Sequence, residues 1–349
     1  MRIFSYANLK DDRWDSEILG LVAQIHEFKG KQELYLKQKP AALEKLVEIA
    51  KIQSTEASNK MEGIVTTSTR LQQLIMEKTS PKNRDEEEIL GYRDVLNTIH
   101  ESYEYIPIRS FYILQLHRDL YQYSQKDIGG RFKNTQNVIA ENHLDGTQTV
   151  RFAPLTPYET PGAIDSICDN FNQAIDACIV DPLVLIPIFI NDFLCIHPFN
   201  DGNGRMSRLL TTLLLYRCGY VVGRYISLES KIEKTKENYY DVLEQCGNGW
   251  HENENDSSPF IKYMLGIVLA AYRDFETRIS LVDEKLPAIE MVRKAVCEKI
   301  GKFTKSDIME LVPSLSKASV ENSLTQLMKD GVIDRHGKGK ATFYTRADM

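Results

Sequence analysis

Apolar residues recur at three- and four-residue spacing along most of this chain, with polar residues between them. That spacing is typical of helices that bury one face. In the first 280 residues it runs through the ranges 15–29, 41–56, 86–103, 110–123, 162–179, 181–196, 206–218 and 259–279. The pattern therefore predicts a mainly α-helical protein.

One segment interrupts the helical pattern. Residues 137–140 and 149–152 have the composition of short strands, and Asp145-Gly146 lies between them. An Asp-Gly pair favours the positive φ angles of a tight turn between two strands. The segment is therefore predicted to form a β-hairpin.

The C-terminal residues 286–349 follow an order of their own. Helical patterns at 288–300, 304–311 and 316–329 precede two strand-like runs at 332–335 and 341–345, with a glycine-containing turn between the strands. Three helices followed by a hairpin are typical of a winged helix-turn-helix.

The length of 349 residues exceeds that of one average domain. The positions of the patterns divide the chain into three parts. We expect an N-terminal helical region at 1–105, a central catalytic core at 106–280 and a winged-helix domain at 286–349.

The composition is that of an ordinary globular protein, with 42% hydrophobic and 26% charged residues. Six cysteines contain no C-x-x-C pair, which favours reduced thiols over a disulfide framework or a zinc site. The N-terminus lacks the apolar core of a signal peptide, and the longest apolar run, residues 183–190, is too short to span a bilayer. We therefore expect a cytoplasmic protein with no membrane partner.

A short segment at residues 197–208 concentrates the candidate chemistry. It reads His-Pro-Phe-Asn-Asp-Gly-Asn-Gly-Arg-Met-Ser-Arg, between one predicted helix and the next. Gly202 and Gly204 allow backbone N–H groups to converge at a helix N-terminus, which attracts anions. Arg205 and Arg208 are three residues apart on that helix, so both can reach the same anion.

Two further side chains of this segment suit a reaction on phosphate. His197 can take a proton near neutral pH, and the carboxylate of Asp201 can bind a hard cation. Together with the anion cradle they predict a phosphoryl- or nucleotidyl-transfer site. The Walker pattern is absent, which excludes a P-loop protein. The alternative for an isolated Gly-x-Gly, a plain turn between helices, does not account for all these groups.

Residues 197–208 resemble the signature of the Fic family, H-P-F-x-[DE]-G-N-G-R-x-x-R, at every defined position. Residues 127–133 resemble the glycine-containing stretch before the family's flap, and the hairpin at 137–152 resembles the flap itself. The flap accepts a target protein as an added strand; a plain hairpin that covers the core is the alternative here. The resemblance spans roughly residues 40–275 and implies a Fic-type helical core.

The resemblance also implies a role for each residue of the signature. His197 would be the general base, and Asp201 would hold Mg²⁺ on the phosphates of ATP. Phe199 would pack inward and anchor the loop. The anion hole would consist of Gly202, Asn203 and Gly204, with the Asn203 side chain on the α-phosphate.

Three more side chains would contact the nucleotide. Arg205 and Arg208 would hold the β- and γ-phosphates, and Tyr240 would flank the adenine unless it is simply a packed helical tyrosine. A Ser, Thr or Tyr hydroxyl of a target protein, which could be the chain itself, would attack the α-phosphorus and release pyrophosphate. His100 and His117, in contrast, are expected to be surface or packing residues.

Residues 58–63 resemble the inhibitory motif of the family, [ST]-x-x-x-E-[GN]. Ser58 and Glu62 are four residues apart and would share one helix face. In the family this glutamate pairs with the second arginine of the signature, here Arg208, and competes with the γ-phosphate. The alternatives are an ordinary helix end at Gly63 and a glutamate that orients water for removal of AMP. A homodimer contact could release the inhibition.

Two other functions remain open. Residues 286–349 contain eleven Lys or Arg and eight Asp or Glu, whereas the whole chain has a net charge of -6. Residues 316–345 could therefore bind DNA, and the Fic-like part would then only sense nucleotide. His197 argues against this regulator because binding alone needs no base. The third option is transfer of another phosphate-linked group, such as UMP or phosphocholine.

Overall fold

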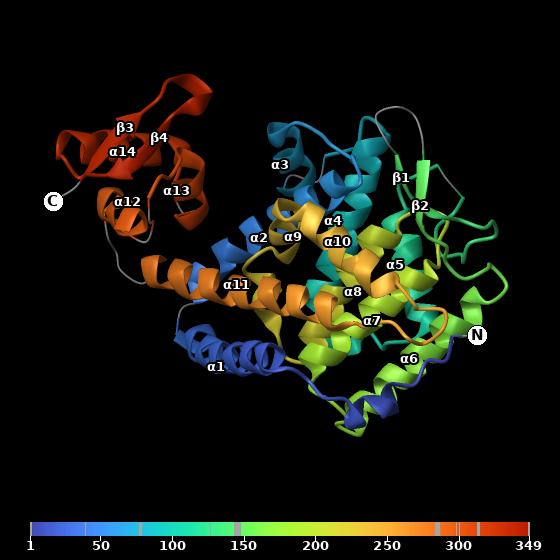
Figure 1. Cartoon of the computed structure of the whole chain (residues 1–349). Helices are drawn as coiled ribbons and strands as arrows, with labels where there is room; N and C mark the ends of the chain where they lie inside the picture. The colour runs from blue at the N-terminus through green and yellow to red at the C-terminus, as the bar shows by residue number, and fades with distance from the viewer. Residues whose placement is uncertain are drawn as a thin grey trace. The chain divides into compact units, whose positions relative to one another are not determined.

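The computed structural model describes residues 2–38, 40–76, 79–125, 127–142, 148–282, 287–297, 299, 301–312 and 315–347. As predicted, the chain is mainly α-helical (Figure 1). It forms two compact units, one of residues 1–27 and 50–271 and one of residues 28–49 and 272–349. Three long helices, α1 (Ser16–Gln38), α2 (Pro40–Met61) and α11 (Ser258–Val282), have residues in both units.

The helices that lie wholly in the first unit are α3 (Ser68–Met76), α4 (Arg84–Ser102), α5 (Ser110–Leu120), α6 (Thr160–Asp176), α7 (Pro182–Ile196), α8 (Asn203–Arg217), α9 (Leu228–Lys234) and α10 (Lys236–Gly247). Short 3-10 turns lie at Tyr6–Asp11, Tyr103–Tyr105 and Val221–Arg224. The predicted helices are present. α3, α9 and α10 are absent from the predicted ranges, and α3 and α9 have too few turns to show a period.

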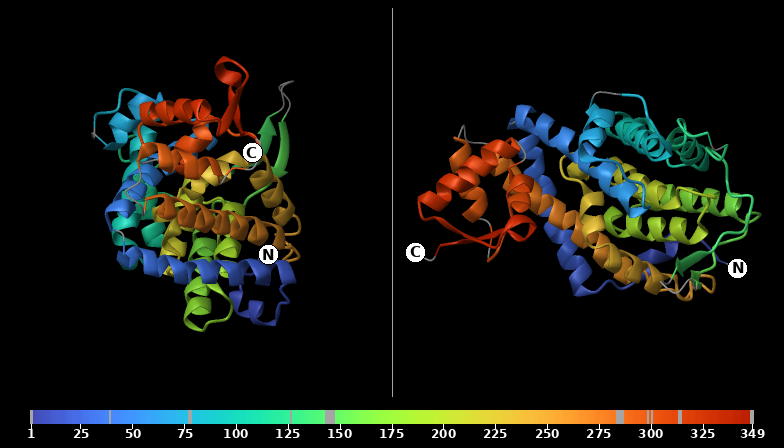
Figure 2. Two further views of the ribbon diagram at one scale, coloured as in Figure 1. Left: turned by 90° about the vertical axis from the view of Figure 1, so that its left-hand side faces the viewer. Right: turned by 90° about the horizontal axis from the view of Figure 1, so that it is seen from above.

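The centre of this unit is the pair α7 and α8, which pack along each other (Figures 1 and 2). α6 and α10 pack against α7, and α4 packs against α8. α7 begins with Pro182, after Asp181, whose side chain accepts a hydrogen bond from the Leu183 N–H. Nearly every residue of α7 is buried, so the helix is surrounded by protein and its C-terminal end is held firmly.

α8 begins at Asn203, three residues before the start that the apolar pattern predicted. The pattern placed the start at Met206 because the residues before it are polar. Gly202 precedes the helix with a φ of 86°, a left-handed conformation that suits glycine. Both Arg205 and Arg208 therefore lie within α8.

The predicted hairpin is formed by β1 (Ile139–Asn142) and β2 (Gln148–Phe152), which pair antiparallel. Glu141 pairs with Thr149, and the register shifts between Ile139 and Ala140. The predicted turn at Asp145-Gly146 lies outside the described residues.

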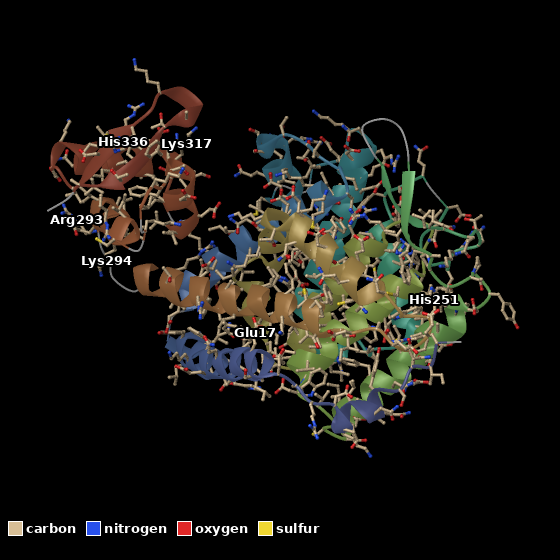
Figure 3. All side chains as sticks on the ribbon, viewed as in Figure 1. Glu17, His251, Arg293, Lys294, Lys317 and His336 are labelled. Atoms are coloured by element: carbon tan, nitrogen blue, oxygen red, sulfur yellow. The ribbon has the colours of Figure 1, made fainter. Side chains whose placement is uncertain are left out.

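The second unit contains α12 (Ala288–Cys297), α13 (Lys305–Leu311) and α14 (Lys317–Lys329), followed by β3 (Ile333–His336) and β4 (Phe343–Arg346). β3 and β4 form an antiparallel hairpin, in the predicted order of elements. A capping box between Thr304 and Asp307 begins α13. Figure 3 labels Lys317 on α14 and His336 on β3.

No helix in the described part of the chain combines the length and the apolar character that a membrane crossing requires.

Candidate functional site

A cavity of about 740 Å³ collects most of the residues that the sequence singled out. Its walls come from α7, the loop after α7, the start of α8, α10 and the hairpin. The predicted site residues that line it are Glu62, His197, Asp201, Gly202, Asn203, Gly204, Arg208 and Tyr240. Arg205 and Ser58 do not line it.

His197 ends α7 in a left-handed conformation, with a φ of 51°. Its Nδ1 lies 3.2 Å from the carbonyl oxygen of Leu194. A carbonyl only accepts hydrogen bonds, so Nδ1 carries the proton and Nε2 keeps a free lone pair. Burial, together with a smaller effect of the Lys133 charge, lowers the pKa of His197 to about 4. The imidazole is therefore neutral at pH 7 and can accept a proton through Nε2.

The loop after His197 is closed by Asn203. The Asn203 amide donates to the carbonyl of Phe199 at 2.8 Å and accepts the Phe199 N–H at 2.9 Å. Phe199 is fully buried, as predicted, and stacks on the His117 ring with centroids 3.7 Å apart. In this structure the Asn203 amide thus holds the loop shape, and its contact with the α-phosphate stays a prediction.

His117 is a residue whose importance the sequence did not reveal. It is fully buried on α5, and its Nδ1 accepts the Gly130 N–H at 3.0 Å. Nε2 therefore carries the proton and donates to the backbone carbonyl of Asp201 at 3.1 Å. Burial lowers the pKa of His117 to about 4, which keeps this arrangement neutral. His117 is a packing residue, as expected, and it also fixes the backbone that carries Asp201.

Lys133 is a second such residue, and it holds the end of α7. Its Nζ donates to the carbonyl of Ile196 at 2.9 Å, and its backbone N–H donates to the carbonyl of Pro198 at 2.8 Å. These bonds lie on either side of His197 in the sequence. Burial lowers the pKa of Lys133 to about 8. A lone lysine in a loop has no sequence pattern that would have revealed this role.

Arg208 is buried and held by the predicted inhibitory motif. Its Nε donates to Ser58 Oγ at 2.8 Å, and its Nη2 donates to the Ser58 carbonyl at 2.9 Å. The same Nη2 lies 2.7 Å from Glu62 Oε1. A side chain at Gly204 would collide with that carboxylate oxygen. Glu62 therefore lies directly against the start of α8, where the anion cradle was predicted.

Arg205 does not line the cavity, although its Nη2 lies 3.9 Å from Asp201 Oδ1. Its side chain is 1% exposed, and Nη2 lies 2.8 Å from both Glu88 Oε2 and the Tyr121 hydroxyl. Because the guanidinium is enclosed by α4 and α5, its predicted contact with the phosphates stays a prediction.

Asp201 supplies the carboxylate of the site. Its side chain is 40% exposed, lines the cavity and accepts the Gly202 N–H at 2.7 Å. The described residues contain no group of three or more His, Cys, Asp or Glu that could hold a metal. A single carboxylate next to a phosphate site fits Mg²⁺, which usually binds one or two carboxylates and takes its other ligands from substrate phosphates and water.

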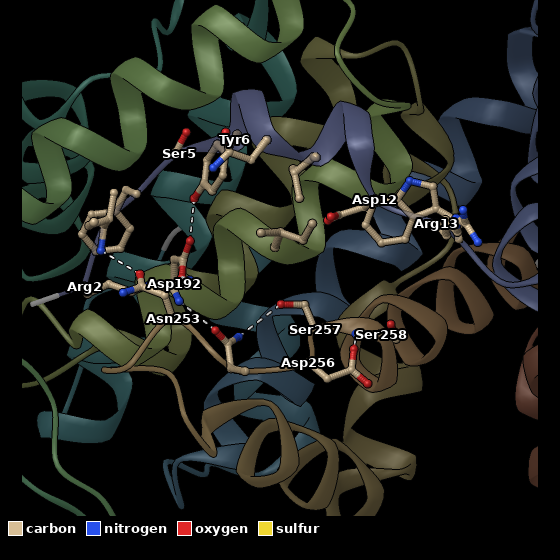
Figure 4. Close-up of a pocket in the computed structure, with 17 residues that line it drawn as sticks. Arg2, Ser5, Tyr6, Asp12, Arg13, Asp192, Asn253, Asp256, Ser257 and Ser258 are labelled. Carbon is tan, nitrogen blue, oxygen red and sulfur yellow. Dashed lines mark hydrogen bonds and ion pairs between the residues drawn. The ribbon is translucent and has the colours of Figure 1, made fainter.

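A second cavity of about 550 Å³ lies beside the N-terminal segment (Figure 4). There Arg2 Nη2 binds Asp192 on α7 at 2.8 Å, and Asp192 also accepts bonds from Tyr6 and Trp250. Trp250 in turn contacts Phe152 at the end of the hairpin. His251, labelled in Figure 3, forms a hydrogen bond with the backbone carbonyl of Ala153, the residue that follows Phe152. The N-terminal segment thus joins α7 to the base of the hairpin.

Comparison with known proteins gives a consistent result. A model of the Fic/DOC family matches residues 107–215, which contain the motif and the hairpin. The chain is 25% identical over 231 residues to Protein adenylyltransferase Fic of Nematostella vectensis; the match covers 64% of this chain and 48% of that protein. The chain therefore spans about half the length of that relative.

Solved structures share the fold. A Fic family protein from Desulfovibrio desulfuricans G20 has a TM-score of 0.62 at 22% identity, with 96% of this chain and 97% of that one covered. A Fic domain containing signaling protein from Bacteroides thetaiotaomicron VPI-5482 has a TM-score of 0.60 at 25% identity, with 74% of this chain and 95% of that one covered.

Proposed function

We propose that this chain, which carries a Fic/DOC family domain over residues 107–215, is a protein adenylyltransferase that moves AMP from ATP to a hydroxyl of a target protein. The observation that carries the proposal is the content of one cavity. It holds a neutral imidazole with a free Nε2, the start of α8 with its backbone N–H groups, and Arg208. The name of the relative from Nematostella vectensis points to the same activity.

In the proposed reaction, a Ser, Thr or Tyr oxygen of the target attacks the α-phosphorus of ATP. The new bond joins that oxygen to phosphorus, the bond from phosphorus to the β-phosphate oxygen breaks, and pyrophosphate leaves. His197 Nε2 takes the hydroxyl proton, which its neutral state allows. The N–H groups at the start of α8 and Arg208 stabilise the negative charge of the phosphates.

Asp201 would hold Mg²⁺ against the nucleotide phosphates, where the ion would neutralise charge on the leaving pyrophosphate. Its carboxylate is exposed to the cavity, and His117 fixes the backbone from which it projects.

Glu62 would restrain this activity. A carboxylate 2.7 Å from Arg208 Nη2 and in contact with Gly204 competes with a phosphate for the same donors. Ser58 fixes the Arg208 guanidinium from the other side. ATP would then bind without placing its γ-phosphate on Arg208, and transfer would be slow.

The test uses Glu62→Gly, incubated with Mg²⁺, α-labelled ATP and a lysate of the source cells. We expect protein labelling to rise about tenfold or more over wild type, because the competing carboxylate is gone. Glu62→Gly/His197→Ala should lose the label. In parallel reactions with γ-labelled ATP, Glu62→Gly should add no label to the background that kinases of the lysate produce, since the γ-phosphate leaves in pyrophosphate.

Glu56→Gly is the matched control. Glu56 is an exposed carboxylate inside α2, the helix that ends one residue before Glu62, and glycine inside the helix disturbs it at least as much. If Glu62→Gly raises protein labelling and Glu56→Gly does not, the activation does not come from a loosened α2. An increase of label from γ-labelled ATP with Glu62→Gly would contradict AMP transfer, and ATP binding without any labelling from α-labelled ATP would favour a nucleotide sensor.

A further inference from the structure

The cavity contains a buried amide that the proposed reaction does not use. Asn191 lies on α7, is 1% exposed, and lines the cavity. Neither its amide nitrogen nor its amide oxygen has a hydrogen-bond partner among the described residues. A buried amide without partners costs stability, so a native protein normally satisfies it, by bonds to protein, water or ligand.

The amide is placed apart from the phosphate end of the cavity. Asn191, Leu194 and Cys195 follow the three- and four-residue spacing of one face of α7, and all three line the cavity. Asn191 precedes His197 by six residues, about 9 Å along the helix. His197 follows the last residue of α7 and lines the same cavity as the start of α8, so a nucleotide bound there by its phosphates could extend toward Asn191.

The cavity that contains the amide also has apolar lining residues. Ile139 and Phe152 come from the hairpin, and Leu243 and Gly247 come from α10. A Cβ atom at Gly247 would lie 3.2 Å from the Phe152 ring, so glycine lets this ring approach α10 closely. Charged residues such as Arg151 and Glu244 line the cavity as well, but apolar lining beside a well-placed amide is typical of a site that orients an aromatic ligand.

We propose that Asn191 recognises the base of the nucleotide and that the base is adenine; this rests on the proposed transfer from a nucleotide. On the purine edge that carries N7, adenine presents a donor beside an acceptor, and an amide pairs with both. Guanine presents two acceptors on that edge, which would leave the amide oxygen without a partner. Asn191 is thus a specificity-determining residue, distinct from the groups that hold phosphate.

The test measures nucleotide binding and not AMP transfer. It uses the Glu62→Gly background, so that the Glu62 carboxylate does not compete with the phosphates. Dissociation constants are compared for ATP, GTP and inorganic tripolyphosphate, which carries no base. Asn191→Leu should weaken ATP binding about 10- to 100-fold, because it removes a bidentate base contact, and should abolish the preference for ATP over GTP. The affinity for tripolyphosphate should not change.

Thermal unfolding without nucleotide provides a second readout. Asn191→Leu should raise the unfolding midpoint, because it removes an unsatisfied amide. Asn172→Leu is the matched control: its amide lies outside the cavity and donates to the Ile108 carbonyl at 2.9 Å. That variant should lower the midpoint and leave the affinity for ATP unchanged. Asn191→Ala replaces Asn191→Leu if the larger side chain prevents folding.

The outcomes separate this inference from the proposed function. Unchanged ATP affinity in folded Asn191→Leu overturns the role of Asn191, while labelling by Glu62→Gly would still support AMP transfer. Tighter binding of GTP than ATP overturns the assignment of adenine. Failure of both ATP and tripolyphosphate to bind overturns the proposed function, and the inference falls with it.

Discussion

At the scale of the residue, the candidate base depends on a lysine that touches no substrate. Lys133 Nζ binds the Ile196 carbonyl and also Asn137 Oδ1 at 3.1 Å, so its ammonium is fixed beside the end of α7. A positive charge near an imidazole disfavours the protonated form, in the same direction as burial. Lys133 therefore positions His197 and helps to keep it neutral.

Replacing Lys133 by methionine tests this. Lys133→Met should raise the pKa of His197 above its value of about 4, because the neighbouring charge is lost. Transfer in the Glu62→Gly background should fall about 10- to 100-fold, since the end of α7 loses its restraint. An NMR titration of the His197 ring and initial rates measure the two effects. The control Arg131→Met, at an exposed residue two positions away, should change neither the His197 pKa nor the transfer rate. An unchanged His197 titration in Lys133→Met would contradict the proposed role of Lys133.

At the scale of the element, the N-terminal segment connects parts of the first unit that are distant in the sequence. Arg2 binds Asp192 on α7 and lies over the Trp250 ring, with its guanidinium carbon 4.9 Å from the ring centroid. Phe152 at the base of the hairpin packs on the same tryptophan. The side chain of Asp192 is 1% exposed, and burial raises its pKa. Its charge in the native protein therefore depends on Arg2.

Removal of Arg2 should destabilise the first unit. Arg2→Met leaves a buried carboxylate without its cation, which costs about 3–5 kcal/mol of unfolding free energy at pH 7. The loss of unfolding free energy in Arg2→Met should become smaller as the pH falls, because a protonated Asp192 needs no cation. Urea unfolding followed by tryptophan fluorescence measures both effects. Arg13→Met, an exposed change in the same segment, should have little effect; an equal loss in the two variants would argue against the buried pair.

At the scale of the whole molecule, the first unit encloses several neutral histidines. Burial lowers the pKa of His100 to about 3 and those of His117 and His197 to about 4. An unfolded histidine titrates near 6.5. Between about pH 6.5 and 4 the unfolded chain therefore binds protons that the native unit does not, so the free energy of unfolding rises with pH in this window.

We predict the slope of the unfolding free energy against pH in this window. Three such groups give at most about 4 kcal/mol per pH unit, with full stability above about pH 6.5. His100→Phe should reduce the slope by about one third. Both tryptophans, Trp14 and Trp250, belong to the first unit, so their fluorescence reports on it. The exposed His336 in the second unit offers the control, His336→Phe, which should leave the slope unchanged.

The sequence by itself determined the elements and the chemistry that depend on local pattern. The long helices could be predicted because each repeats its apolar spacing over several turns. The hairpin could be predicted from the composition of its two strands. The segment 197–208 concentrates a base, a carboxylate, an anion cradle and an arginine within twelve residues. These groups reach one cavity because the turn between α7 and α8 places them there.

Only the tertiary structure decided what depends on contacts between distant segments. It placed Arg205 against Glu88, brought Lys133 and His117 to the motif loop, and left the Asn191 amide in the cavity wall. None of these has a local signature, since each depends on which residues of other elements surround the side chain. The short helices α3 and α9 were missed for a related reason: packing stabilises them, and they are too short for a periodic pattern.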